Sequence, residues 1–448
     1  MFSATWRRAC VDKPVEFSVD PNTDWSEYYP KGAEIQQYWE GVVERHGLQD
    51  SVHLKREVLR ATWLQGANQW AVEIKNLEDG NVFVDTTDFF VSAQGRISVP
   101  KYPEIEGLYE TFGGDVIHTA KWPSGFDLTG KRVAVIGNGA SGQQLVPNIL
   151  SQVSRLDHYV RTKTWVTATF SRGLHEATAE APGGPVYTEE QKRTFRDDPA
   201  AYLEHRRFFA LMFQQAPGRE VIGSKANNEL RERIIDTMRQ RLGGDEQWLQ
   251  RVLPDYAPGC KRLTPAPGYL EALRHEKVDY ITDPIVRVDK TGIITADGRH
   301  HEVDVIITAT GFELGFTSHF PVIGSDGIDL RDKWSPDGEI GYPESYLGVM
   351  APGCPNYFTI LQVSSHADLV QRGEKLIRHR LRETHVAVRS HYSVRSRRHI
   401  SQSVSAKYSR RATYHWSLGR MRPRSLTTSR MGTLMTRCSG INVIVGLS

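Results

Sequence analysis

The sequence predicts an α/β fold with a dinucleotide-binding unit, and three features support this prediction. A short β-branched run at residues 132–136 is typical of a strand that is buried on both faces. The glycine pattern G-x-G-x-x-G follows at once at residues 137–142, and a helical pattern begins at residue 141. Further strand-like and helix-like segments alternate along the chain, which favours a parallel sheet covered by helices.

Each glycine of this pattern has its own physical task. Gly137 permits the tight turn after the strand, Gly139 lets the backbone approach a pyrophosphate, and Gly142 lets the next helix pack close to the strand. That helix, at residues 141–150, directs its first N–H groups at the phosphates. The residues expected to bind a dinucleotide here are Gly137, Asn138, Gly139, Ala140, Ser141 and Gly142.

The next strand, predicted at residues 156–160, bears on which dinucleotide binds. An NAD site places an acidic residue near the end of this strand, where it accepts the ribose 2′-OH. This chain has Arg161, Thr162 and Lys163 there instead. Two cations suit a 2′-phosphate, because Arg offers a bidentate fork and Lys a point charge. A solvated basic strand end is the alternative, and we predict NADPH.

Composition is that of an ordinary globular protein, with 39% hydrophobic and 24% charged residues. Apolar runs stay well short of a membrane span, and the first residues have no apolar stretch typical of a signal peptide. The four cysteines are scattered without a C-x-x-C pair, which argues against a zinc site and against a disulfide reductase. We therefore expect no metal and a cytoplasmic location.

The C-terminal part has an unusual charge. Residues 384–448 contain eleven Arg and one Lys but no Asp or Glu. A basic arm for nucleic acid or an anionic surface is one interpretation, a disordered tail is the favoured one, and a segment foreign to the natural end of the protein is the third. We expect no nucleic-acid partner.

The rest of the chain predicts further elements. A helix is expected at residues 31–46, ended by Gly47. Residues 188–253 look helical and begin with a possible capping box of Thr188 and Gln191. A β-meander of short strands is expected at residues 52–54, 57–63, 70–75 and 82–85.

Two buried strands are predicted to end at glycines. Residues 88–93 lead to Gly95, and a similar run at residues 303–312 contains Thr310 and Gly311. A glycine where a strand ends indicates the close approach of a ligand or of another backbone. These two strand ends are therefore candidate contacts of a cofactor.

A second motif lies shortly before the glycine pattern. Residues 112–123 read F-x-G-x-x-x-H-x-x-x-W-P and include His118 and Trp122. This motif resembles the fingerprint of the flavin-dependent Baeyer–Villiger monooxygenases, and the glycine pattern stands where that family binds NADPH. The resemblance covers about residues 15–361 and is greatest to fungal members that act in secondary metabolism. It implies two Rossmann-like domains that bind FAD and NADPH, with a ketone and O2 as substrates.

The resemblance also implies domains and roles. The NADPH domain, residues 124–308 with a helical insertion at about 188–253, would be inserted in an FAD domain made of residues 1–123 and 309–361, and residues 362–448 would form an atypical tail. Arg262 would reach the reactive face of the flavin, with a surface cation as the alternative. Asp12 is a weaker catalytic candidate. His118 would be a cofactor-linked residue rather than a general base, and Trp122 a packing anchor. Gly95, Thr310 and Gly311 would lie where the domains cross.

The chain departs from the family at both ends. The family begins with a glycine loop of its own for FAD, whereas this sequence contains a single G-x-G-x-x-G. We therefore expect a truncated or mis-predicted product that binds FAD poorly. Three functions compete: a Baeyer–Villiger monooxygenase that makes an ester or lactone, a flavin monooxygenase that oxidises N or S atoms, and a non-catalytic nucleotide-binding remnant. The second motif and Arg262 argue against N or S oxidation.

Overall fold

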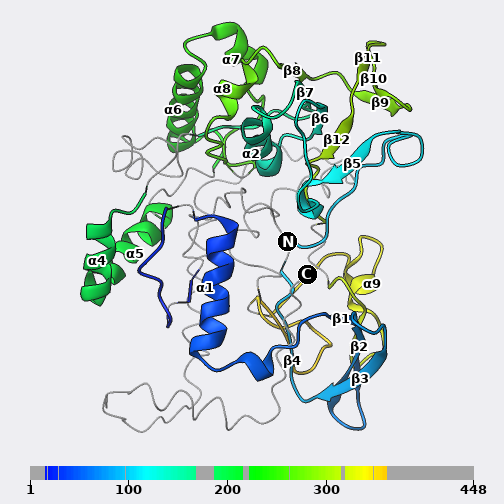
Figure 1. Ribbon diagram of the computed structural model, residues 1–448. Coiled ribbons are helices and arrows are strands. Elements are labelled where there is room, and N and C mark those ends of the chain that lie inside the picture. The colour runs from blue at the N-terminus through cyan, green and yellow to red at the C-terminus, as the bar shows by residue number, and fades with distance from the viewer. Residues whose placement is uncertain are drawn as a thin grey trace, which may run out of the picture. The chain divides into compact units, whose positions relative to one another are not determined.

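The computed structural model describes residues 16–17, 19–28, 30–95, 97–167, 186–214, 221–261, 263–313, 318–346 and 348–360. Their contacts divide them into two compact units, which are taken one at a time (Figure 1). The first contains the described residues up to Arg56 together with those of Gln94–His319, and the second contains Glu57–Ala93 and those from Phe320 onward. Among these residues, no helix is both long and apolar enough to span a membrane.

A five-stranded parallel sheet organises the first unit (Figure 1). Its strands, in spatial order, are β5 (Asp115–His118), β12 (Val305–Thr308), β6 (Arg132–Ile136), β7 (Arg155–Tyr159) and β8 (Val278–Ile281). The predicted strands at residues 132–136 and 156–160 are thus confirmed, the second within one residue. The α/β fold class is confirmed as well.

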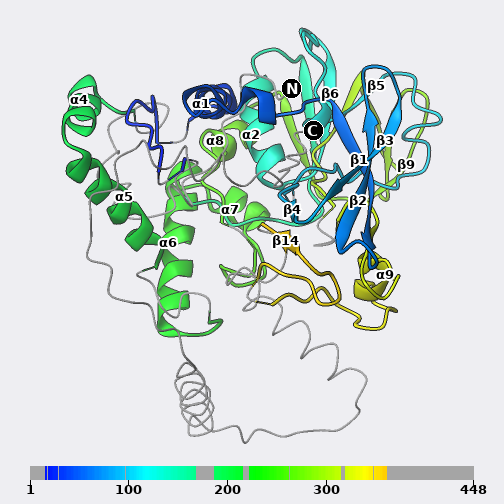
Figure 2. The same cartoon turned by 90° about the horizontal axis from the view of Figure 1, so that it is seen from below.

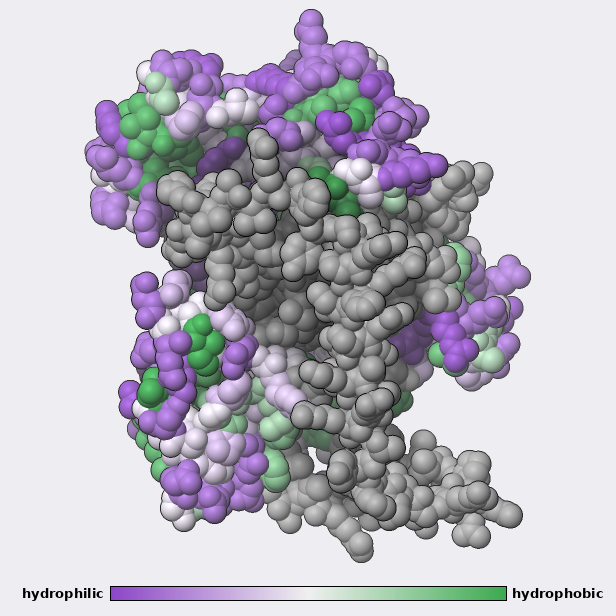
Figure 3. Space-filling view, turned by 180° about the vertical axis from the view of Figure 1, so that it is seen from behind, coloured by the Kyte–Doolittle hydropathy of each residue, from purple (hydrophilic) through white to green (hydrophobic). Residues whose placement is uncertain are grey.

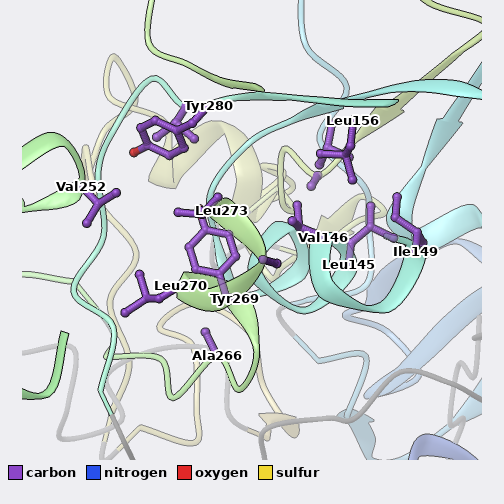
Figure 4. Close-up of a cluster of buried hydrophobic side chains, with 14 of the residues drawn as sticks. Leu145, Val146, Ile149, Leu156, Val252, Ala266, Tyr269, Leu270, Leu273 and Tyr280 are labelled. Carbon is purple, nitrogen blue, oxygen red and sulfur yellow. The ribbon is translucent and has the colours of Figure 1, made fainter. Parts of the chain in front are cut away.

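Both faces of this sheet are buried, which explains the continuous apolar run in β6. Val133 and Val135 pack on one side against α2 (Ala140–Ile149), together with apolar residues of α6 (Lys225–Arg241), α7 (Glu246–Val252) and α8 (Tyr269–Leu273). Figure 4 shows side chains of α2, β7, α7, α8 and β8 in this cluster. Ala134 and Ile136 belong to a second cluster on the opposite side. That cluster includes residues of an antiparallel meander, formed by β9 (Ile285–Val288), β10 (Gly292–Thr295) and β11 (His300–Glu302).

The helical region predicted at residues 188–253 is confirmed at residues 188–214 and 221–253, whereas residues 215–220 lie outside the described part of the chain. It contains α4 (Glu189–Asp197) and α5 (Pro199–Gln214) before α6 and α7. The capping box is also confirmed, since Gln191 N–H donates to Thr188 Oγ1 and the Thr188 N–H donates to Gln191 Oε1. On α6 the apolar residues Ile234 and Met238 are buried in the core.

The N-terminal helix α1 (Gly32–Arg45) is confirmed, and Gly47 follows it with a left-handed φ of 61°. The strand expected at residues 52–54 is wrong. A 3-10 turn, η1 (Gln49–Ser51), stands before it, and Lys55 adopts a φ of 54°, which is incompatible with an extended strand. The strand begins only at Arg56.

The second unit is a smaller β structure. Its four-stranded sheet has the order β13 (Val322–Ile323), β1 (Arg56–Leu64), β2 (Gln69–Asn76) and β3 (Val82–Thr87). A separate pair joins β14 (Tyr357–Thr359) to β4 (Phe90–Ser92) in parallel. The short helix α9 (Leu330–Trp334) lies beside the larger sheet in both ribbon views (Figures 1 and 2). The atypical tail expected at residues 362–448 lies outside the described residues.

The described surface is mostly hydrophilic on the face that Figure 3 shows, and its hydrophobic residues form separate small patches. Such scattered apolar residues are normal for globular proteins. The folding free energy of the chain is therefore expected to come from the clusters on either side of the parallel sheet rather than from this surface.

Gly114 offers a test of the packing beside β5. A Cβ atom at Gly114 would lie 2.3 Å from the Asp304 carbonyl oxygen and 2.8 Å from the Phe112 ring. We expect Gly114→Ala to lower the free energy of unfolding by roughly 1–3 kcal/mol, because the backbone must shift to admit the methyl group. Urea unfolding measures this change. Gly66→Ala is the control, since a Cβ there meets nothing within 4 Å, and an equal loss in both variants would contradict the explanation.

Candidate nucleotide-binding site

The parallel sheet brings most of the predicted site residues to one side, at the carboxyl ends of its strands. Its register aligns Thr308 with both His118 and Ile136, and Ile136 in turn with Tyr159. The strands therefore end level with one another, and the segments that follow them leave the sheet at the same edge. In open parallel sheets, ligands bind outside the carboxyl ends of the strands. The glycine loop, the basic segment and the Thr310–Gly311 turn all follow strands that end here.

The glycine loop has two packed positions and one open position. A Cβ at Gly137 would lie 2.5 Å from the Ala309 carbonyl oxygen, and Gly137 has a φ of 114°. A Cβ at Gly142 would lie 2.1 Å from the Gly137 carbonyl oxygen. Gly139, in contrast, has nothing within 4 Å of its Cβ position. The outer two glycines thus serve close backbone packing, while the middle one borders open space.

The N-terminus of α2 is available to an anion. Gly139 is the N-cap residue and supplies no side chain to cap the first N–H groups of the helix. These N–H groups and the helix dipole favour a negatively charged ligand. The preceding residue, Asn138, is held in place by two hydrogen bonds. Its Oδ1 accepts one from the Tyr269 hydroxyl at 2.7 Å, and its carbonyl oxygen accepts one from Thr164 Oγ1 at 3.0 Å.

The two cations of the basic segment after β7 have different surroundings. Arg161 and Thr162 are exposed, and no described acidic residue forms an ion pair with Arg161. Lys163 is half-buried, and its Nζ donates to the Gln250 carbonyl oxygen in α7 at 3.2 Å. The Lys163 carbonyl oxygen accepts a hydrogen bond from the Tyr256 hydroxyl. Arg161 therefore has the freer charge, whereas the Lys163 ammonium is partly committed to the protein.

The position of His118 suits a residue that links β5 to the turn after β12, and not one that exchanges protons. The side chain is buried, and its Nδ1 accepts a hydrogen bond from the Ala120 N–H at 3.0 Å. Burial lowers the pKa of His118, and the Gly311 carbonyl offsets part of this shift. The ring is consequently neutral at physiological pH. It lies beside the rings of Tyr102 and Phe312, so it joins β5 to the turn after β12.

The remaining cofactor candidates have different surroundings. Gly311 has a φ of 85°, and its carbonyl oxygen accepts from the Lys101 N–H. Thr310 Oγ1 donates to the Lys101 carbonyl oxygen. Gly95 has a φ of 74° with open space at its Cβ position, and Trp122 packs as a half-buried side chain against the core cluster that contains α2.

The two catalytic candidates, Arg262 and Asp12, lie outside the described residues. The flanks of Arg262 are described. On one side the Lys261 ammonium lies 5.0 Å from the centre of the Tyr256 ring. On the other, the Thr264 carbonyl oxygen accepts from the Thr167 N–H at 2.9 Å. The segment that carries Arg262 is therefore tied to the chain that continues from the basic segment.

Sequence reasoning missed the residues whose side chains contact the glycine loop from the protein interior. Tyr269 and Thr164 hold Asn138, and His158 lies within 3.2 Å of the Gly137 carbonyl oxygen. Their types follow no motif, and only the tertiary packing of α8 and β7 brings them to the glycines. The fold and the site together define a dinucleotide-binding protein of the Rossmann-like class.

Comparisons with known proteins show which proteins the chain is similar to. No protein-family model matches the chain. It is 36% identical over 343 residues to the FAD-binding monooxygenase tazF of Aspergillus terreus, which covers 76% of this chain and 59% of that protein. It is 33% identical over 353 residues to a Baeyer–Villiger monooxygenase of Pseudomonas aeruginosa, which covers 77% and 61%.

Solved structures agree with these relatives. The open crystal structure of cyclohexanone monooxygenase is 25% identical, with a TM-score of 0.64 over 84% of this chain and 80% of that one. The crystal structure of OTEMO in complex with FAD and NADP is also 25% identical, with a TM-score of 0.63 over 81% and 74%. Over the part that it spans, this chain is similar to FAD-binding and Baeyer–Villiger monooxygenases. It spans about three fifths of the length of the two relatives.

Substitution by alanine should affect nucleotide binding at the open glycine and stability at the packed glycine. Gly139→Ala should leave the unfolding midpoint unchanged, because its φ of −80° suits alanine and its Cβ position is open. It should nevertheless weaken NADP+ binding by roughly tenfold or more, because the methyl group stands where a pyrophosphate approaches. Gly142→Ala should instead lower the free energy of unfolding by roughly 1–3 kcal/mol. Calorimetric titration and thermal unfolding measure both effects, and normal NADP+ binding by Gly139→Ala would refute the assignment.

Proposed function

We propose that this chain carries the NADPH-binding part of an FAD- and NADPH-dependent Baeyer–Villiger monooxygenase, which converts a ketone into an ester or lactone with one oxygen atom of O2. The observation that carries the proposal is the glycine loop at the edge of the parallel sheet, with Arg161 beside it and His118 of the second motif at the same edge. The relatives named above support the same reaction class.

The described residues fit NADPH. The open Gly139 position and the first N–H groups of α2 would receive the pyrophosphate. Arg161 would pair with the 2′-phosphate through its planar fork, and Lys163 would add a weaker contact because its ammonium already donates to Gln250. An acidic residue, which would favour NADH, is absent from positions 161–163.

The fit to FAD is only partial among the described residues. The single G-x-G-x-x-G of the sequence serves the NADPH site, and an FAD pyrophosphate needs a comparable loop. Gly95, Thr310 and Gly311 would border the flavin, since two of them have left-handed backbones that leave their Cβ positions open. When bound, FAD would accept electrons from NADPH and activate O2.

The domain assignment completes the proposal. Residues 124–308 would form the NADPH domain, inserted between two segments of the FAD domain, 1–123 and 309–361. Arg262 would place a fixed positive charge where negative charge develops on oxygen. We further propose a cytoplasmic location and a polyketide- or terpenoid-like ketone, on the strength of the resemblance to fungal members. N or S oxidation and a non-catalytic remnant remain the competing functions.

The decisive experiment combines a spectrum with turnover. The purified protein, given FAD and NADPH, is mixed with a panel of ketones under isotope-labelled dioxygen. Because the chain is expected to bind FAD poorly, FAD is supplied in excess, and the proposal expects weak flavin binding and one labelled oxygen atom in an ester product. Label on nitrogen or sulfur would select the competing monooxygenase instead. NADP+ binding without flavin or product would select the nucleotide-binding remnant.

Arg161→Ala should reduce the preference for NADPH over NADH. The loss of a charged, bidentate contact costs roughly 1.5–3 kcal/mol, which corresponds to about tenfold or more in NADPH affinity. NADH affinity should stay unchanged, because NADH carries no 2′-phosphate. Binding titrations with both nucleotides measure the ratio. Arg287→Ala is the control, since Arg287 is an exposed arginine on β9; a ratio that survives Arg161→Ala would remove Arg161 from the site.

Arg262→Ala should abolish ester formation while NADPH binding persists, because the variant lacks the fixed charge that we propose beside the flavin. The control is Lys261→Ala, which removes the neighbouring cation that rests on the Tyr256 ring. Product analysis and NADP+ titration on flavin-loaded protein separate the two effects. Full ester formation by Arg262→Ala, or equal loss in both variants, would eliminate the proposed role.

A further inference from the structure

A buried hydrogen-bonded chain supports the glycine loop from beneath. The Tyr269 hydroxyl lies 2.7 Å from Asn138 Oδ1 and 3.4 Å from His158 Nδ1. The opposite ring nitrogen, His158 Nε2, lies 3.2 Å from the Gly137 carbonyl oxygen. Tyr269 and His158 are both buried, with 2% and 0% of their surface exposed. Two side chains from distant parts of the sequence thus contact two consecutive residues of the loop.

The shortest contact gives the direction of these hydrogen bonds. Burial lowers the pKa of His158 to about 4, so its ring is neutral at neutral pH and carries one N–H. The Gly137 carbonyl can only accept, which places that proton on Nε2. The Tyr269 hydroxyl donates its one proton to Asn138 Oδ1 at 2.7 Å, so the 3.4 Å approach to His158 Nδ1 is a packing contact and not a second donated hydrogen bond. The Asn138 amide is therefore held with its oxygen toward Tyr269.

This orientation decides what Asn138 offers to a ligand. An amide has one acceptor oxygen and a donor NH2 group on opposite sides. With the oxygen bound to Tyr269, the NH2 group remains for other partners, and Asn138 is half-buried beside the open Gly139 position. A pyrophosphate accepts hydrogen bonds and repels a carbonyl oxygen. If the amide were free to turn, it would present the wrong group for part of the time.

We propose that Tyr269 is a positioning residue for NADPH, which locks the Asn138 amide with its NH2 group toward the pyrophosphate. The inference rests on the proposed function, because it requires a dinucleotide at the loop. The place of Tyr269 in the fold is suited to this task. Tyr269 begins α8, directly after Gly268 with its φ of 74°, and is packed into the same cluster as Leu145 and Val146 of α2 (Figure 4).

A second buried tyrosine provides the matched control. Tyr280 is 2% exposed and its ring centre lies 6.1 Å from that of His158, close to the 5.7 Å between Tyr269 and His158. Within the described part of the chain, its hydroxyl does not bond to the glycine loop. Tyr280→Phe therefore removes the same atom from the same core without touching Asn138.

The test is NADP+ titration of the full chain by calorimetry, with thermal unfolding measured without nucleotide. Tyr269→Phe should raise the Kd for NADP+ roughly five- to tenfold, as expected for one lost hydrogen bond. Tyr280→Phe should leave the Kd unchanged. Asn138→Ala should raise the Kd to a similar extent, and Tyr269→Phe should have no additional effect in that background, because Tyr269 acts only through Asn138.

Each other result overturns the inference. Unchanged binding by Tyr269→Phe, an equal effect of Tyr280→Phe, or a full additional effect in the Asn138→Ala background would show that Tyr269 is a core residue only. If Tyr269→Phe does not fold, Asn138→Ala alone decides, and normal NADP+ binding by it refutes the proposal. A wild-type protein that does not bind NADP+ would refute the proposed function as well, so the two failures are distinguishable.

Discussion

The close approach of three backbone segments is the constraint on which the site depends. β6 ends at Ile136, and a side chain on the next residue, Gly137, would lie 2.5 Å from the backbone that follows β12. α2 then begins so close that Gly142 has no room for a Cβ beside Gly137. A larger residue at either position would push the helix away from the sheet. The N–H groups of α2 would then no longer point at the edge where the strands end, and an anion would lose its site.

At the opposite ends of the strands, where β6 and β12 begin, ion pairs join the two strands. The Arg132 backbone N–H and guanidinium both donate to the Asp304 carboxylate, and the guanidinium also bonds to Glu302. These bonds hold the starts of β6 and β12 level, and they keep the pKa of Asp304 below its usual range. Strands that start level and have the same register also end level. The ion pairs at one edge therefore help to align His118, Ile136 and Thr308 at the other.

Sequence reasoning succeeded where the signal was local. The β-branched run before the glycines, the capping box at Thr188 and the terminating Gly47 each depend on neighbours within a few residues, and the structure confirms these elements. It failed where tertiary contacts decide. Trp39 follows the buried Tyr38 on α1, yet it is 37% exposed and meets Phe17 edge-on. Residues 52–54 looked extended, yet the left-handed Lys55 delays the strand.

For the site as well, sequence reasoning predicted the local features and missed those that depend on tertiary contacts. The glycines and the basic segment follow from motif and spacing, but the difference between Arg161 and Lys163 does not. It arises because α7 places the Gln250 carbonyl within reach of one cation and not the other. Tyr269 and Asn138 are 131 residues apart, so no local pattern relates them. Supports of this kind can be recognised only when the packing of α8 on α2 is known.

The charge at the nucleotide edge comes from groups that do not titrate near neutral pH. Burial keeps His118 neutral, and it lowers the pKa of His158 to about 4. Both histidines therefore act through the position of a hydrogen bond. The positive potential is left to Arg161, to Lys163 and to the N-terminus of α2. Affinity for a phosphate-bearing nucleotide then depends on the geometry of the loop, because the protein charges that meet it stay constant.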